Sequence, residues 1–132
     1  MLKVLRSTGV VAGLFVLLSS SAAHAACVAP RDLNGIWQAN DGGTYYIRQI
    51  GDNVWWLGMS ADDGRHFTNV YKGVLNGNSV RGSYADVPRG GVRSGGSLNL
   101  AIVRGGGGGI LEVRRVGASP FGGARWTKPC DD

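Results

Sequence analysis

The sequence predicts an all-β protein, an eight-stranded antiparallel up-and-down meander barrel. Short runs rich in β-branched and aromatic residues follow one another along the chain, and no window shows sustained helical spacing. Glycine, 23 residues in all, falls mainly between these runs, where it marks turns. Each connection is short enough for a hairpin, and closing a meander into a barrel removes exposed sheet edges.

The first 25 residues are expected to be a signal peptide. MLKVLR is basic, residues 10–18 form an apolar run, and Ala23-His24-Ala25 has the small residues of a cleavage site. The apolar run is far shorter than the roughly 20 residues needed to cross a bilayer, so no membrane anchor is expected. We therefore expect a secreted or periplasmic protein with a single β-barrel domain over residues 26–132.

The expected domain is mildly basic and carries a cysteine near each end. The whole chain has a formal charge of +5, and removal of Lys3 and Arg6 with the signal peptide leaves +3. This charge favours acidic surfaces without requiring them. Cys27 and Cys130 form an even pair in an exported protein, which predicts one disulfide bond joining the termini. A loop of about 100 residues gives roughly 4.7 kcal/mol in the chain-entropy model.

Eight strands are predicted in order, each bounded by turn residues. They cover residues 34–39, 44–50, 54–60, 65–72, 79–86, 97–103, 110–116 and 124–128. The turn signals between them are Asp41-Gly42-Gly43, Gly51-Asp52-Asn53, Asp62-Asp63-Gly64, Asn76-Gly77-Asn78, and residues 88–96, 105–109 and 119–123.

Alternation of apolar and polar residues predicts the inner face of the later strands. In the sixth strand, Leu98, Leu100 and Ile102 share one face and are expected to be buried. In the seventh strand, Leu111 and Val113 share a face that is expected to be internal.

The second and third strands each carry an aromatic doublet. Successive strand side chains point to opposite faces, so one ring of each doublet faces inward and the other outward. A three-residue turn with Asn53 in the left-handed conformation places Tyr45 and Trp55 inside, and it makes the inner face the more apolar one. A two-residue turn would instead place Arg48 and Leu57 on one face.

The outward side chains predict a candidate ligand-binding patch. With a three-residue turn, Arg48 lies across from Trp56, a geometry suited to guanidinium stacking. The same rings would also suit cover by another part of the chain or by a second copy, so a homo-oligomer stays open. The predicted patch consists of Tyr46, Arg48 and Trp56.

The segment LNGIWQANDGGTYYI, residues 33–47, resembles the first hairpin of calycin-like barrels, the avidin and lipocalin type, through Gly35-Ile36-Trp37. The resemblance implies an eight-stranded meander barrel of exported origin. It also implies that Trp37 plugs one barrel end beneath an arginine from the last strands, Arg115 or Arg125. The positions that contact biotin in avidins are out of step here, so biotin binding is not implied. The string from NDGGTYYIRQIG through ADVPRGG is similar to small bacterial exported domains without an assigned function.

The sequence offers little material for catalysis or metal binding. His66 is the single histidine of the expected domain, and it is expected on a strand surface. Asp62-Asp63-Gly64 lacks the spacing of a calcium loop and is explained by a tight turn. We therefore expect no enzyme, no metal site and no cofactor.

Two functional classes follow for an exported barrel of this kind. The first is a non-catalytic binding module that contacts a small molecule or carbohydrate through the aromatic patch or the barrel mouth. The alternative is an inhibitor or other interaction barrel that contacts an exported protein through rim loops, of which residues 87–96 form the longest. Arg89-Gly90-Gly91 and Arg104-Gly105-Gly106 resemble nucleic-acid-binding steps, but export argues against that partner.

Overall fold

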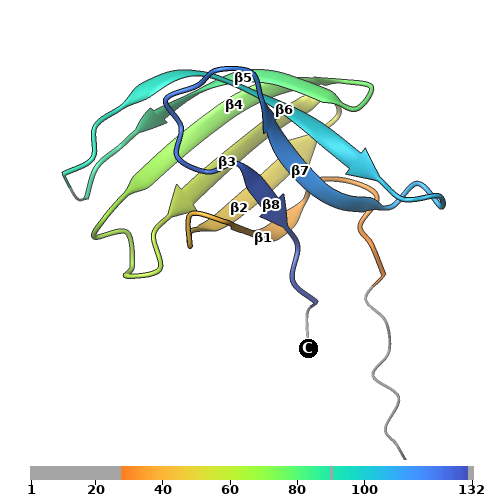
Figure 1. Cartoon of the computed structure of the whole chain (residues 1–132), viewed down its shortest axis with the longest axis horizontal. Coiled ribbons are helices and arrows are strands. Elements are labelled where there is room, and N and C mark those ends of the chain that lie inside the picture. The colour runs from red at the N-terminus through yellow and green to blue at the C-terminus, as the bar shows by residue number, and fades with distance from the viewer. Residues whose placement is uncertain (1–27, 90, 131–132) are drawn as a thin grey trace, which may run out of the picture.

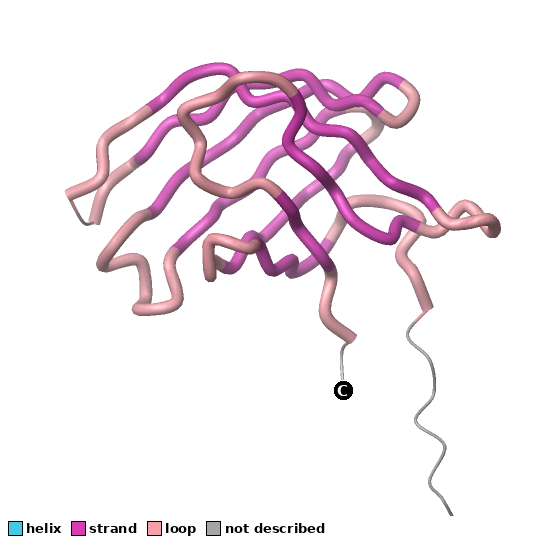
Figure 2. Tube along the Cα trace, in the orientation of Figure 1, coloured by secondary structure: helices cyan, strands magenta, loops and turns pink. Residues whose placement is uncertain are grey.

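A computed structural model describes residues 28–89 and 91–130, and in it eight antiparallel strands follow one another around a closed barrel (Figure 1). This confirms the predicted fold class. The strands are β1 (Gly35–Ala39), β2 (Thr44–Ile50), β3 (Asn53–Met59), β4 (Thr68–Asn76), β5 (Ser79–Asp86), β6 (Gly95–Arg104), β7 (Ile110–Val116) and β8 (Arg125–Thr127). Every described residue outside the strands lies in a loop or turn (Figure 2), and no helix in the described part could span a membrane.

The largest displacement from the predicted bounds is in β4, which begins three residues later and ends four residues later than expected. The hydroxyl of Ser60 accepts hydrogen bonds from the backbone N–H groups of His66 and Phe67 at 3.2 and 3.1 Å, and it donates to Asp62 at 2.5 Å. These bonds hold the connection in a turn. His66 consequently lies exposed in the β3–β4 connection and not on a strand, contrary to the expectation.

The strand faces are as predicted in β6 and differ in β7. Leu98, Leu100 and Ile102 are buried, which confirms the first alternation. Leu111 was expected inside beside Val113, but it is 57% exposed, and that prediction is wrong. The register shifts at this point, since Val103 pairs with residue 112 and the next residue pairs with residue 110. Leu111 is therefore the extra residue of a β-bulge, which turns it outward.

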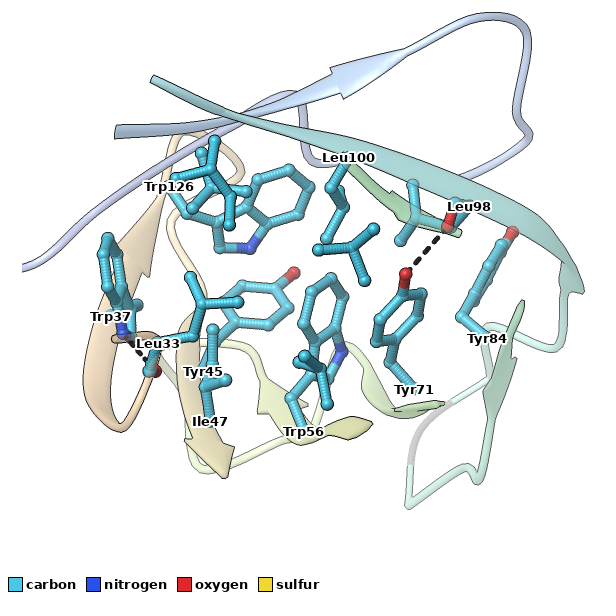
Figure 3. Packing of buried hydrophobic residues seen from close by; sticks show 14 of the residues in the cluster. Leu33, Trp37, Tyr45, Ile47, Trp56, Tyr71, Tyr84, Leu98, Leu100 and Trp126 are labelled. Carbon is cyan, nitrogen blue, oxygen red and sulfur yellow. Dashed lines mark hydrogen bonds between the residues drawn. The ribbon is translucent and has the colours of Figure 1, made fainter. Parts of the chain in front are cut away.

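The barrel interior is filled by aromatic rings (Figure 3). Trp56 stacks on Tyr71 with 4.3 Å between ring centroids, and it meets Tyr45 edge-on at 5.3 Å. The indole N–H of Trp56 donates to Oδ1 of buried Asn69 at 2.9 Å. Among the described residues, the indole N–H of Trp126 is the buried side-chain group without a hydrogen-bond partner.

Two glycines leave space inside the barrel for the ring of Tyr71. Gly73 and Gly82 face each other across β4 and β5, and a Cβ on Gly82 would lie 2.3 Å from the carbonyl oxygen of Lys72 and 2.6 Å from the hydroxyl of Tyr71. The Tyr71 hydroxyl crosses this space to donate to the carbonyl of Leu98 at 3.0 Å. Any larger residue at position 82 would therefore displace backbone.

Residues 28–34 cover one end of the barrel. Ile110 N donates to the carbonyl of Pro30 at 2.7 Å, and Leu33 N donates to the side chain of Gln49 at 3.0 Å. Leu33 is buried beneath this cover, and its carbonyl accepts from Trp37 Nε1 at 2.9 Å (Figure 3). This end of the barrel is closed by backbone and apolar side chains.

A narrow junction between β1 and β8 closes the barrel. Each strand contributes only two residues to it, in the pairs Gln38 with Thr127 and Ala39 with Trp126. Asn40 extends the junction, because its side-chain oxygen accepts from Ala124 N at 2.8 Å and from the next backbone N–H at 3.1 Å. We call this region the closing seam.

Candidate functional site

Four connections gather at the barrel end opposite the cover. They are the links β1–β2, β3–β4, β5–β6 and β7–β8, which extend toward the left of Figures 1 and 2. An antiparallel meander places alternate turns at the same end. We call this end the mouth.

A pocket of about 320 Å³ lies at the mouth and receives residues from all four connections. This volume lies at the lower end of the range for small-molecule sites. The residues that line it are Asp41, His66, Phe67, Asn69, Tyr84, Asp86, Val92, Ser94, Pro120, Phe121 and Gly122.

Phe121 connects the pocket to the aromatic core. Its side chain is buried, and its ring meets Tyr84 edge-on at 4.6 Å. Below the pocket the same ring lies 5.9 Å from Trp56 and 5.9 Å from Trp126. The pocket thus has a fixed aromatic floor, because a ring packed against four others cannot move without repacking the core.

Two carboxylates line the pocket, that of Asp41 from the β1–β2 connection and that of Asp86 from the end of β5. Asp41 accepts a hydrogen bond from the hydroxyl of Tyr45 at 2.5 Å and from Gly43 N at 2.8 Å. Asp86 accepts from the backbone and hydroxyl of Ser94 through one oxygen, at 2.6 and 3.0 Å. The hydrogen-bond chain continues from Ser94 to the Tyr84 hydroxyl at 2.9 Å.

Burial, together with these carboxylates, raises the pKa of Tyr45, whose ring lies in the aromatic core. Burial raises the pKa of Tyr45 far above its ordinary value, and the hydrogen bond and negative charge of Asp41 raise it further. The charge of Asp86 acts in the same direction. Tyr45 therefore remains a neutral donor to Asp41.

The predicted exterior patch is not formed as expected, because the β2–β3 turn has two residues. Ile50 pairs with Asn53, and Gly51 at the first central position has a φ of 57°, the conformation that two-residue hairpin turns favour for glycine. Trp56 consequently faces inward and is 4% exposed, whereas Trp55 faces outward beside Arg48. The prediction that Trp56 is external is wrong.

The other doublet faces as predicted, with Tyr45 fully buried and Tyr46 outside. Arg48 is also exposed, but its cross-strand partner is Trp55, and Lys72 lies over the Trp55 ring at 5.9 Å. Tyr46 instead belongs to a row of apolar side chains in register across four strands. The row is Ile36, Tyr46, Leu57 and Val70, each more than two fifths exposed.

Trp37 is fully buried, as the G-x-W resemblance implies. The arginines proposed to lie above it have other partners. Arg115 donates to the carbonyl of Phe121, and Arg125 lies 3.8 Å from the carboxylate of Glu112. The described cation–ring contact in the barrel joins Lys72 to a different tryptophan, so the arginine cover of Trp37 has no support.

Two predictions concern residues outside the described part of the chain. The signal peptide over residues 1–25 lies there entirely. Cys27 lies there also, so its predicted disulfide bond to Cys130 stays a prediction.

Comparisons of the chain with protein-family models, with curated proteins and with solved structures found no match. The closed eight-stranded antiparallel barrel is compatible with a calycin-like barrel.

Most residues of the pocket carried no local signal in the sequence. Asp41 looked like a turn residue, and Phe121 lay in a glycine-rich connection. The loop 87–96 was the exception, because its length marked it as a functional loop, and it supplies Val92 and Ser94 to the pocket. Over residues 28–89 and 91–130 no group of three or more His, Cys, Asp or Glu side chains is arranged to hold a metal ion.

Proposed function

We propose that this protein is a non-catalytic, exported binding module that holds a small molecule in the pocket at its mouth. The observation that supports the proposal most directly is the form of the pocket. A buried aromatic floor at Phe121 lies beneath hydrogen-bonding groups from separate connections, including Asp41 and Ser94. An apolar surface with a few fixed polar groups is the usual composition of a small-molecule site.

The closed opposite end supports the same function. Residues 28–34 seal that end, so a ligand would enter and leave at the mouth. The aromatic core fills the rest of the barrel, which limits the ligand to a compound of one or two rings. The exported location in this proposal rests on the sequence of residues 1–25.

Filling the pocket should abolish ligand binding without unfolding the barrel. Val92 lines the pocket and is 39% exposed, so Val92→Trp adds a ring to the pocket while the core stays intact. The matched control is Val87→Trp, in the same connection but outside the pocket lining and 60% exposed. We expect benzyl alcohol or benzylamine to shift the amide NMR signals of pocket residues in the wild type and in Val87→Trp.

In Val92→Trp the same additions should leave those signals unchanged. The proposal would be wrong if neither probe shifts pocket signals in the wild type, or if both still do so in the filled variant. A protein inhibitor that acts through the rim loops would give the first of these results.

A further inference from the structure

The carboxylates that line the mouth pocket have the sign opposite to the net charge of the protein. The whole chain carries +5, yet none of the lysines and arginines that the structure describes lines the pocket. The acidic and basic side chains that line it are Asp41, Asp86 and His66, which together give −2 when the histidine is neutral. A pocket of this sign attracts cations and repels anions.

Among the described residues, no basic side chain forms an ion pair with either carboxylate. In the part of the chain that the structure describes, the ion pairs join Arg114 and Arg125 to Glu112, away from the pocket. Asp41 and Asp86 accept hydrogen bonds only from neutral groups, namely Tyr45, Ser94 and the backbone. Two negative charges in a concave, partly apolar site therefore retain most of their attraction for a positive ligand group.

The aromatic walls favour the same kind of ligand. The rings of Phe67, Tyr84 and Phe121 line the pocket together with the carboxylates. The face of an aromatic ring attracts a cation, and the attraction increases when the cation loses water. A carbohydrate would use the ring faces but would leave both charges without a partner.

We infer that the ligand is a small organic cation, an ammonium group joined to a flat apolar body, with the ammonium between Asp41 and Asp86 and the body against Phe121. This inference rests on the proposed function and narrows its ligand class. The pocket volume of about 320 Å³ accommodates one such ring with a short amine chain.

Three probes of nearly equal shape and different charge test the inference. Benzylamine is positive, benzyl alcohol is neutral and benzoate is negative at pH 7. By NMR titration of the full protein, benzylamine should bind about tenfold more tightly than benzyl alcohol, the preference expected of a partly solvated charge pair. Benzoate should not bind at the pocket.

Variants that remove one negative charge from the pocket give a second test of the inference. Asp86→Asn keeps an acceptor for Ser94 and should weaken benzylamine binding about tenfold while leaving benzyl alcohol unchanged. Asp41→Asn should act in the same direction, and it serves as the second variant if the first fails to fold. Asp52→Asn, exposed in the β2–β3 turn at the covered end, is the matched control and should change neither affinity.

The outcomes separate this inference from the proposed function. Equal binding of benzylamine and benzyl alcohol, or unchanged benzylamine affinity in both pocket variants, would show that the ligand is not selected for positive charge. The proposed function as a small-molecule-binding module would still stand. Preferred binding of benzoate would overturn it as well. Absence of pocket binding by all three probes would overturn both proposals.

Discussion

Trp56→Ala is expected to lower the free energy of unfolding by about 3 to 5 kcal/mol, the usual cost of truncating a core tryptophan. The Trp56 ring contacts Tyr71, Tyr45 and two further rings, and its removal would leave a cavity beneath the pocket. It would also leave the buried side chain of Asn69 without its indole donor.

Trp55→Ala is the matched control, because it removes the same side chain from the neighbouring position on the outer face. Its expected cost is about 1 kcal/mol, since the ring is partly exposed and its described ring contact is Lys72. Urea unfolding of the two variants, followed by circular dichroism, gives the comparison. If Trp55→Ala is the more destabilising variant, the observed β2–β3 register is incorrect.

Strong destabilisation is also expected at alkaline pH. Burial raises the pKa of Tyr45 and of Tyr71 well above the ordinary value near 10, so both stay protonated in the folded state when the unfolded chain has lost those protons. The unfolded state then binds fewer protons, and stability falls as pH rises. The stabilisation is complete below about pH 10 and decreases by about 1.4 kcal/mol per pH unit for each tyrosine above it.

Urea unfolding at pH 8, 10 and 11 measures this slope. Tyr71→Phe should reduce the slope by about half, because one of the two buried phenols no longer titrates in the unfolded state. Tyr46→Phe, on the outer face, should leave it unchanged. Equal slopes in all three proteins would show that the buried phenols are not responsible.

The architecture could be predicted because its signals are local. Turn residues such as Asn76-Gly77-Asn78 mark where each hairpin reverses. Leu98, Leu100 and Ile102 place the large aliphatic side chains of β6 at alternate positions. Eight hairpin-linked strands leave few topologies besides a meander. The closed strand order could therefore be inferred without any long-range information.

The facing of β3 could not be predicted, because the outer surface of this barrel is itself apolar. Leu57 is 42% exposed and continues the exterior row with Tyr46, so polarity does not distinguish inside from outside there. A three-residue turn would separate apolar from polar residues, but the outer face of β2 and β3 carries both kinds. The bulge at Leu111 reversed a second inference in the same way, since alternation assumes uninterrupted pairing.

The pocket was hidden from sequence for a different reason. Asp41 and Asp86 are 45 positions apart in the sequence, and both line one pocket because the closed sheet curves β1 and β5 around the same mouth. A site assembled from four loops has no spacing that a motif could record. The length of the loop at residues 87–96 predicted one part of the pocket lining, but it did not predict that the pocket is acidic.

The closing seam has a consequence for the order in which the chain folds. It joins residues 38–39 to residues 126–127, a far greater separation along the chain than in any other strand pair, in exchange for two paired positions on each side. The loss of chain entropy on loop closure is largest for such a contact, and few paired residues compensate for it. Closure of the seam should therefore be the last step of folding and the first to reverse. Hydrogen exchange should find the amides of β8 the least protected of the sheet, while those of β4 and β5, joined by eight register pairs, exchange slowest. The native protein would then interconvert with a curved, open eight-stranded sheet. The predicted bond between Cys27 and Cys130, which flank the seam residues along the sequence, would shift that equilibrium toward the barrel.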